Sequence, residues 1–182
     1  MSTHVVLLRG VNVAGHGRIA MSDLRDLVTS LGCTAVASYI QSGNLVLTST
    51  QQSAALADLI EQQVGVRLGV RTTAVVLTRD QLTAVVAGNP YPDETDPKHL
   101  HAVFRRNGFG ADDLAEIATA QRKAATRGSR DQATVVGGTL YLRTPDGLGR
   151  SELAVLLGRS VTAAGTTRNW TTVTRLVAML AG

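Results

Sequence analysis

The stretch "AVASYIQSGNLVLT", residues 35–48, contains two short apolar runs separated by the turn sequence Ser-Gly-Asn. Runs of this kind on either side of a Gly-Asn pair are typical of a β-hairpin. Apolar residues at helical spacing predict one helix before the hairpin, at residues 22–31, and one after it, at 53–64. Apolar runs at residues 4–8 and 70–77 predict one strand outside each helix. The resulting order, strand–helix–strand–strand–helix–strand, is that of a ferredoxin-like unit.

The second half of the chain repeats this pattern after a proline-rich segment, residues 89–97, which holds three of the four prolines. The elements predicted there are a strand at 100–105, a helix around 114–118, hairpin strands at 133–136 and 139–143, and helices at 151–157 and 173–180. We therefore predict an α+β chain of two fused ferredoxin-like (alpha-beta plait) units with antiparallel sheets. We expect the N-terminal unit at residues 1–78 and the C-terminal unit, with an extra terminal helix, at 79–182.

Polar residues mark the starts of four predicted helices. Ser22 and Ser151 each stand where an N-cap hydroxyl would accept a hydrogen bond from the first turn, and Ser53 opens the helix that follows the hairpin. Thr78 and Gln81 have the spacing of a capping box, which predicts a short helix ended by the glycine at position 88.

The composition favours a cytoplasmic protein without membrane contacts. Hydrophobic residues make up 44% of the chain, yet no apolar run reaches the ~20 residues that a membrane-spanning helix needs. The start of the chain lacks the features of a signal peptide, and the single Cys33 excludes an intrachain disulfide. The net charge of +4 comes with sixteen arginines and two lysines. Because guanidinium groups pair well with carboxylates and phosphates, this bias permits anionic partners, although the net charge is modest.

The loop after the first strand has glycines at positions 10 and 15, the spacing of a nucleotide-binding P-loop. A P-loop also requires a lysine and then a serine or threonine after the second glycine. His16 and Gly17 stand there instead. The predicted helix begins too late for its amides to close on a phosphate. The sequence therefore argues against a nucleoside-triphosphate site.

The predicted topology nevertheless brings polar groups together at one edge of the first sheet. In a split unit, the first helix connects the first strand to the second, and these two strands are not adjacent in the sheet. The second strand of the hairpin lies between them and is therefore a neighbour of the first strand. The end of the first strand and the hairpin turn should then be close in space. The residues expected to converge there are Arg9, Gly10, Asn12, Gln41, Ser42, Gly43 and Asn44. An arginine at the end of a buried strand needs a partner, either an anionic ligand or a protein carboxylate such as Asp23. The glycines and asparagines could equally serve only as turn residues.

Four motifs in this order, "LLRGVNVAG", "YIQSGNLVL", "NPYP" and "TTRNWTTVTRL", closely resemble an uncharacterised bacterial family, domain of unknown function 1697. The resemblance extends over nearly the whole chain and implies two fused ferredoxin-like units, but it implies no activity. The polar residues that it carries over are Arg9, Gly10, Asn12, Gln41, Ser42, Gly43, Asn44, Thr167, Arg168, Asn169 and Trp170. The chain departs from the family where lysines are common, at His16, at Arg18 and at Glu152, which puts any role for an ammonium group there in doubt.

Other segments offer weaker signals. Arg168, Asn169 and Trp170 precede the last helix and could hold an anion, although we favour a capping and packing role. The glycine-rich turn at residues 145–152 could bind an anion through backbone amides, but such a turn more often only leads into a helix. His99 and His101 alternate on a strand, and two histidines fall short of a metal site. We therefore predict no metal and no cofactor.

The leading hypothesis is a protein that binds a small anionic or polar ligand at the edge formed by the Arg9–Asn12 loop and the Gln41–Asn44 turn. One alternative is an enzyme that uses the same site, with Ser42 or a histidine in proton transfer. Ser42 and Cys33 lack a nucleophile motif, so the sequence does not decide whether the protein is catalytic. The other alternative is nucleic-acid binding through arginines, which the absence of aromatic residues on the predicted central strands disfavours. The oligomeric state is not predicted.

Overall fold

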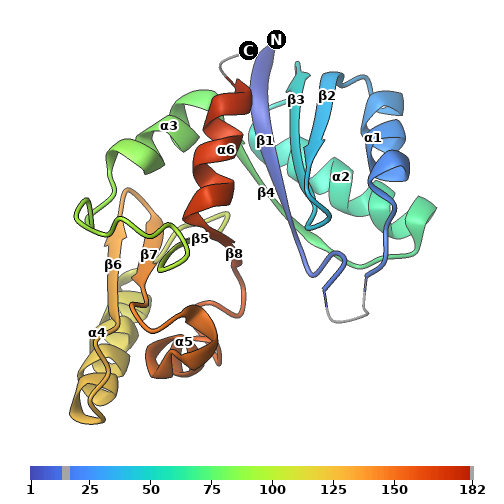
Figure 1. Ribbon diagram of the computed structural model, residues 1–182. Coiled ribbons are helices and arrows are strands. Elements are labelled where there is room, and N and C mark those ends of the chain that lie inside the picture. The colour runs from blue at the N-terminus through green and yellow to red at the C-terminus, as the bar shows by residue number, and fades with distance from the viewer. Residues whose placement is uncertain (14–16, 181–182) are drawn as a thin grey trace. The chain divides into compact units, whose positions relative to one another are not determined.

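The computed structural model describes residues 1–13 and 17–180 (Figure 1). The first sheet has the strand order β2-β3-β1-β4, with all neighbours antiparallel. Its elements are β1 (Ser2–Arg9), α1 (Met21–Ser30), β2 (Thr34–Tyr39), β3 (Asn44–Ser49), α2 (Ser53–Leu68) and β4 (Thr73–Thr78). Helix α1 connects β1 to β2, and β3 lies between these two strands, as predicted. This is the strand arrangement of a ferredoxin-like unit.

The second sheet repeats this arrangement in the order β6-β7-β5-β8, again antiparallel throughout. Its elements and those around it are α3 (Arg79–Ala87), β5 (Leu100–Phe104), α4 (Ala111–Thr126), β6 (Gln132–Val136), β7 (Thr139–Arg143), the 3-10 turn η1 (Leu148–Arg150), α5 (Glu152–Leu157), β8 (Thr166–Asn169) and α6 (Trp170–Leu180). The prediction of two fused ferredoxin-like units is confirmed.

Strand β8 is the one strand of the described residues that the sequence analysis did not predict. Its four residues, Thr-Thr-Arg-Asn, contain no apolar side chain, so they show no strand periodicity. Two of them are nevertheless buried, because β8 pairs with the central strand β5 from Thr166 opposite Phe104 to Asn169 opposite His101. Tertiary pairing rather than local sequence therefore makes this segment a strand.

Contacts along the chain divide it into two compact units. One comprises residues 1–83 together with the end of α6 from Leu176, and the other comprises residues 84–175. Helices α3 and α6 each contribute residues to both units. The proline-rich segment at residues 89–97 contains no helix or strand and lies within the second unit.

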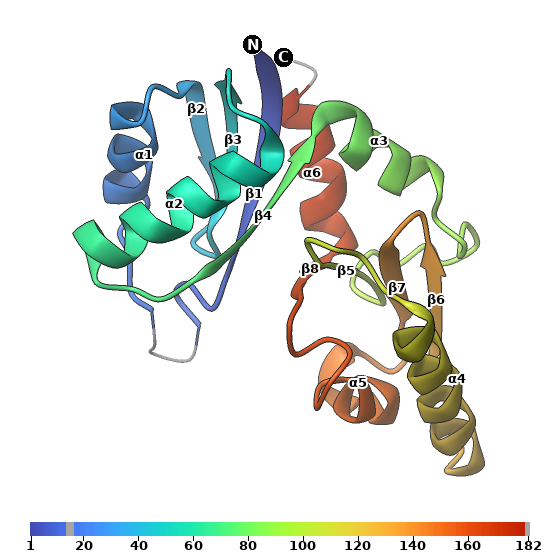
Figure 2. The same cartoon turned by 180° about the vertical axis from the view of Figure 1, so that it is seen from behind.

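Two helices cover one face of each sheet, α1 and α2 in the first unit and α4 and α5 in the second, as Figure 2 shows for α1 and α2. In the first unit, Val6 and Leu8 of β1 pack in one core with buried leucine, isoleucine and valine of both helices. In the second unit, Val103 of β5 shares a core with residues of α4, β7 and α5, among them Ile117 and Leu153. Alternation along the strands places these side chains on the helix-covered face. No helix in the described part of the chain is long and apolar enough to cross a membrane.

The helix starts differ from the prediction in one of four cases. Helix α1 begins at Met21 after Ala20, so Ser22 is not its N-cap, whereas α2 begins at Ser53 as predicted. The capping box of Thr78 and Gln81 is confirmed, because the backbone N–H of each donates to the side-chain oxygen of the other. Ser151 also caps α5, where its Oγ accepts from Ala154 N at 2.9 Å.

Two buried histidines predict a loss of stability in mild acid. His4 on β1 and His101 on β5 are 2% and 7% exposed, and the Nδ1 atoms of both have no hydrogen-bond partner among the described residues. Burial lowers the pKa of both imidazoles. The unfolded state therefore binds protons more readily than the folded state below the ordinary histidine pKa of about 6.5, so unfolding becomes easier as pH falls.

We expect the free energy of unfolding, measured by urea titration, to fall between pH 7 and pH 5. In the double variant His4→Leu/His101→Leu, which removes both titrating groups, it should change much less over that range. An equal pH dependence in both proteins would assign the effect to other groups.

Candidate functional site

The end of β1 and the β2–β3 turn lie together, as the topology predicted. Leu7 is opposite Asn44 in the β1–β3 register, and Leu8 N donates to the carbonyl oxygen of Gly43 at 2.9 Å. The loop after β1 is tied to the same turn by the side chain of Asn12, whose Nδ2 donates to the carbonyl oxygen of Gln41 at 2.8 Å. Asn12 thus contacts the turn directly, and Arg9 and Gly10 lie along the chain between this contact and the Leu8–Gly43 hydrogen bond. Gly15 and His16, two of the positions compared with a P-loop, lie outside the described residues.

Asn12 holds this loop closed. Its Nδ2 also donates to Ile19 O, and its Oδ1 accepts from Ile19 N, both at 2.8 Å. Its backbone N–H donates to Gly17 O at 2.9 Å. Asn12 adopts a left-handed conformation with φ of 55°, which asparagine tolerates better than most residues. Because both amide hydrogens are used inside the protein, Asn12 positions the loop.

Asn44 also has an internal role. It is fully buried, and its Nδ2 donates to Tyr39 O at 3.1 Å and to Ser42 Oγ at 2.9 Å. Gly43 is buried as well, and its φ of 74° lies in the left-handed region that favours glycine. Of the predicted ligand residues in the turn, Gln41 is exposed and Ser42 half-buried. The turn therefore combines two structural residues with two that solvent can reach.

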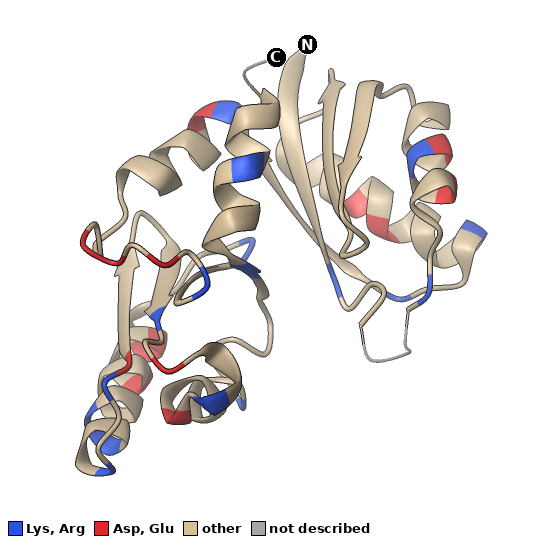
Figure 3. Cartoon of the chain, in the orientation of Figure 1, with Lys and Arg blue, Asp and Glu red and all other residues tan. Residues whose placement is uncertain are grey.

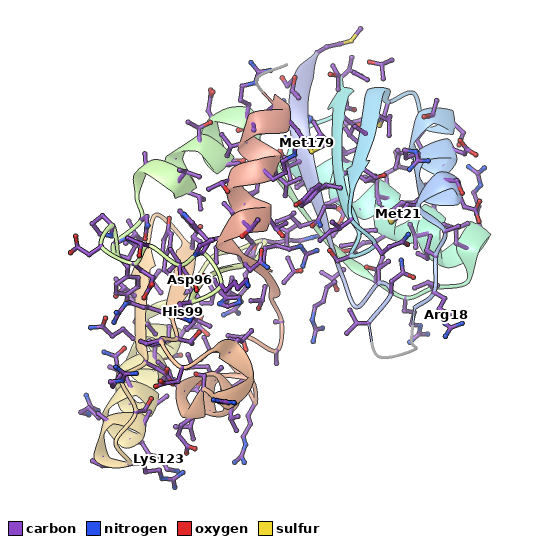
Figure 4. All side chains as sticks on the ribbon, viewed as in Figure 1. Arg18, Met21, Asp96, His99, Lys123 and Met179 are labelled. Atoms are coloured by element: carbon purple, nitrogen blue, oxygen red, sulfur yellow. The ribbon has the colours of Figure 1, made fainter. Side chains whose placement is uncertain are left out.

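Two shallow pockets divide the predicted site. One, of about 480 Å³, is lined by Arg9 and Gly10 together with Val13, Arg71, Thr72 and Thr73. The other, of about 400 Å³, is lined by Asn12, Arg18, Ile19, Ala20 and Gln41. Arg18 is labelled in Figure 4, in the segment that leads to α1. We refer to the first as the Arg9–Arg71 pocket.

The sequence analysis missed Arg71, Thr72 and Thr73. Strand β4 runs antiparallel to β1, with Thr73 opposite Arg9, so the start of β4 lies beside the end of β1. Thr72 Oγ1 donates to Arg9 O at 2.8 Å and fixes the two segments to each other. The topology itself was the signal that could have identified Arg71, since residues just before the fourth strand of a split unit meet the end of the first.

The guanidinium groups of Arg9 and Arg71 are exposed, and neither forms an ion pair with a described residue. Asp23, the carboxylate considered as a partner for Arg9, accepts instead from the adjacent Ser22 hydroxyl. All acidic residues of the first unit lie on helices: Asp23, Asp26, Asp58, Glu61 and Asp80. Figure 3 shows this separation, with basic positions at the end of β1 and before β4. The Arg9–Arg71 pocket is therefore cationic.

The second unit provides an internal comparison. Arg105 directly follows its central strand β5, as Arg9 ends β1, but Arg105 is neutralised within the protein. Its Nη1 lies 2.8 Å from Asp113 Oδ1, and its guanidinium stacks over the ring of Phe109 at 5.0 Å. Hydrogen bonds from the Gly110 amide and from Arg105 lower the pKa of the Asp113 carboxyl. Of these two arginines at equivalent positions, Arg105 pairs with a carboxylate, whereas Arg9 has no carboxylate partner among the described residues.

The remaining predicted ligand residues, at the start of α6, have structural roles. Arg168 is 9% exposed, donates to Thr166 Oγ1 at 2.6 Å and to Thr167 O at 2.9 Å, and burial lowers its pKa to about 10. Asn169 caps α6, because its Oδ1 accepts from Thr172 N at 2.9 Å. The ring of Trp170 packs against Tyr141 with centroids 6.1 Å apart. These contacts agree with the capping and packing role.

The residues of the other candidate sites also make contacts within the protein. Around the turn at residues 145–152, Arg130 pairs with Asp146, Arg127 pairs with Glu152, and Ser151 donates to the buried Asp131. Only His101 of the histidine pair lies on β5, since His99 precedes the strand. Within the described residues, no group of three or more His, Cys, Asp or Glu could hold a metal ion. Burial raises the pKa of the Cys33 thiol, which disfavours a nucleophilic role.

Ile40 carries strain beside this site, and we expect its removal to stabilise the protein. This β-branched residue precedes Gln41 with φ of 50°, and its side chain is 52% exposed, so burial does not compensate for the conformation. Ile40→Gly should raise the free energy of unfolding by about 1 kcal/mol, measured by urea titration. A destabilised variant would show that the Ile40 side chain makes contacts worth more than the strain.

Comparisons with known proteins agree with this fold. The protein family described as "Protein of unknown function (DUF1697)" matches residues 1–141. The motif at residues 166–176 therefore lies beyond the matched region. A search of curated proteins found no match. Among solved structures, the chain is similar to the conserved bacterial protein SP0830 from Streptococcus pneumoniae, with 22% sequence identity, a TM-score of 0.76 and coverage of 98% of each chain. At this identity the similarity shows the fold.

Proposed function

The chain belongs to the DUF1697 family, whose function is unknown, and we propose that it binds a small anionic ligand in the Arg9–Arg71 pocket. One observation carries the proposal. Two exposed guanidinium groups line one pocket without an ion pair to a described residue, whereas the equivalent Arg105 is paired with Asp113. We further propose a cytoplasmic location, for which the single buried cysteine is the support.

The chemistry of the pocket favours an anion with several acceptor oxygens. Each guanidinium presents a planar fork of N–H donors that matches a carboxylate or a phosphate. Thr73 adds a polar side chain on the β4 side of the pocket, whereas the Thr72 hydroxyl donates to Arg9 O. Two cations beside one ligand also favour a dianion over a monoanion. We therefore propose phosphate and its monoesters as the leading ligand class.

Asn12 and the turn have an indirect part in this function. The amide of Asn12 fixes the loop that carries Gly10 and Val13, and its bond to Gln41 O anchors that loop to the sheet. The pocket is therefore held by a strand end, a strand start and a clamped loop. A site built on such rigid elements needs little rearrangement to bind.

Isothermal titration with inorganic phosphate and methyl phosphate tests the proposal. We expect Arg9→Ala and Arg71→Ala each to weaken binding about tenfold, which corresponds to 1.4 kcal/mol. Arg105→Ala is the matched control, because it removes an arginine from the equivalent position of the second unit and should leave affinity unchanged. Equal affinity in wild type and both pocket variants would contradict the proposal. A short oligonucleotide that binds with steep salt dependence where phosphate does not bind would favour nucleic-acid binding instead.

A further inference from the structure

The Arg9–Arg71 pocket has an apolar wall as well as a cationic one. Val13 lines it from the loop after β1, and its side chain is 56% exposed. Thr72 and Thr73, whose side chains each include a γ-methyl group, line the pocket from the opposite segment of chain. Thr72 Oγ1 donates to Arg9 O, so its hydroxyl is directed toward the backbone of β1. An inorganic anion would use the guanidinium groups and leave this apolar surface in water.

Val13 directly follows a residue that is fixed by hydrogen bonds. Asn12, the preceding residue, makes three side-chain hydrogen bonds, to Ile19 N, Ile19 O and Gln41 O. The hydrogen bonds of Asn12 therefore set the point from which Val13 extends beside the two arginines. An exposed valine fixed next to a cationic pocket provides a contact surface for an apolar group attached to the bound anion.

On the basis of the proposed anion site, we propose that the ligand is a phosphate monoester with an apolar substituent. The phosphate group pairs with Arg9 and Arg71, and the substituent packs against Val13 and the methyl groups of Thr72 and Thr73. Val13 is then a specificity-determining residue, because it selects alkyl or aryl esters over inorganic phosphate. The part of the substituent that packs in the pocket is short, since the pocket is shallow and has a volume of about 480 Å³.

A series of soluble esters tests this inference by isothermal titration. Full burial of one methylene group increases affinity about fourfold. Because Val13 remains partly in water, we expect about twofold per methylene between methyl and n-butyl phosphate, or roughly tenfold in all. Val13→Ser should bind methyl phosphate as wild type does and lose most of the increase for n-butyl phosphate. Val13→Leu should retain or strengthen the increase.

The outcomes separate this inference from the proposed function. If methyl phosphate binds through the arginines but n-butyl phosphate binds no tighter, the inference is wrong and the proposed function stands. An increase with chain length that survives in Val13→Ser would also overturn the role of Val13. If no phosphate binds the wild type, both proposals fail.

A final measurement identifies the source of such an ester. The protein is sedimented with phosphatidylcholine vesicles that contain phosphatidic acid. Binding to the vesicles that is lost in Val13→Ser would support the inference and identify the ester as a lipid headgroup. Binding of n-butyl phosphate without cosedimentation would support it with a soluble ester.

Discussion

Gly43→Ala is expected to lower the free energy of unfolding by about 3 kcal/mol, through two separate effects. Gly43 has φ of 74°, a conformation that costs an L-residue about 1 kcal/mol or more. A Cβ atom at this position would also lie 2.8 Å from Leu8 Cβ and 3.3 Å from Val11 Cβ. Leu8 is a buried core residue of β1 and cannot move away without disturbing the helix-covered core.

Gly10→Ala is the matched control for Gly43→Ala. Gly10 has nearly the same φ, 70°, but a Cβ there would meet no atom of a described residue within 4 Å. Its replacement should therefore cost only the backbone penalty, about 1 kcal/mol. Urea unfolding of both variants measures the difference, which is the cost of the close approach between the turn and β1. An equal decrease in the free energy of unfolding of the two variants would show that the side chains of Leu8 and Val11 move aside at no cost.

Asn12→Ala should lower the free energy of unfolding by about 2–3 kcal/mol. The substitution removes three hydrogen bonds, each with a net contribution of about 1 kcal/mol, and leaves the Ile19 amide without its acceptor. It also places alanine at φ of 55°, where asparagine is better tolerated. Because the loop carries one wall of the Arg9–Arg71 pocket, phosphate affinity should fall together with stability.

Gln41→Ala tests whether the hydrogen bonds of Asn12 or the side chain of Gln41 stabilise the loop. Asn12 bonds to the backbone carbonyl of Gln41, which alanine retains, and the Gln41 side chain is exposed. Its replacement should change the free energy of unfolding by less than about 0.5 kcal/mol. If the free energy of unfolding fell as much as in Asn12→Ala, the Gln41 side chain, and not the hydrogen bonds of Asn12, would stabilise the loop. Arg9→Ala, by contrast, should change affinity with little effect on stability.

The distinction between Arg9 and Asn12 changes how the shared motif is understood. Both residues belong to the motif "LLRGVNVAG", and the sequence analysis assigned both to the ligand. In the structure, Asn12 and Asn44 satisfy backbone groups of their own loops, whereas Arg9 has no ion pair with a described residue. A motif residue can therefore maintain the site without contacting the ligand. The proposed binding itself remains a prediction for the titrations above.

The sequence by itself determined the elements that have strong local signals. Helical spacing identified α1, α2 and α4, and the turn sequences Ser-Gly-Asn and Gly-Gly marked both hairpins. Their order was sufficient to predict two split units and to bring Arg9 next to residues 41–44, because few topologies satisfy the connection rules. Local periodicity and chain direction contain this information without any knowledge of packing.

Only the tertiary structure decided which polar groups remain available for a ligand. Strand β8 forms because β5 offers it a pairing edge, and Arg71 joins Arg9 because β4 runs antiparallel to β1. Arg9 and Arg105 follow similar apolar strands, yet Asp113 pairs with Arg105 while every acidic residue of the first unit lies on a helix and none pairs with Arg9. Ion pairs and hydrogen bonds depend on distances of a few ångströms between residues far apart in sequence, and these distances are set only when the sheets and helices pack.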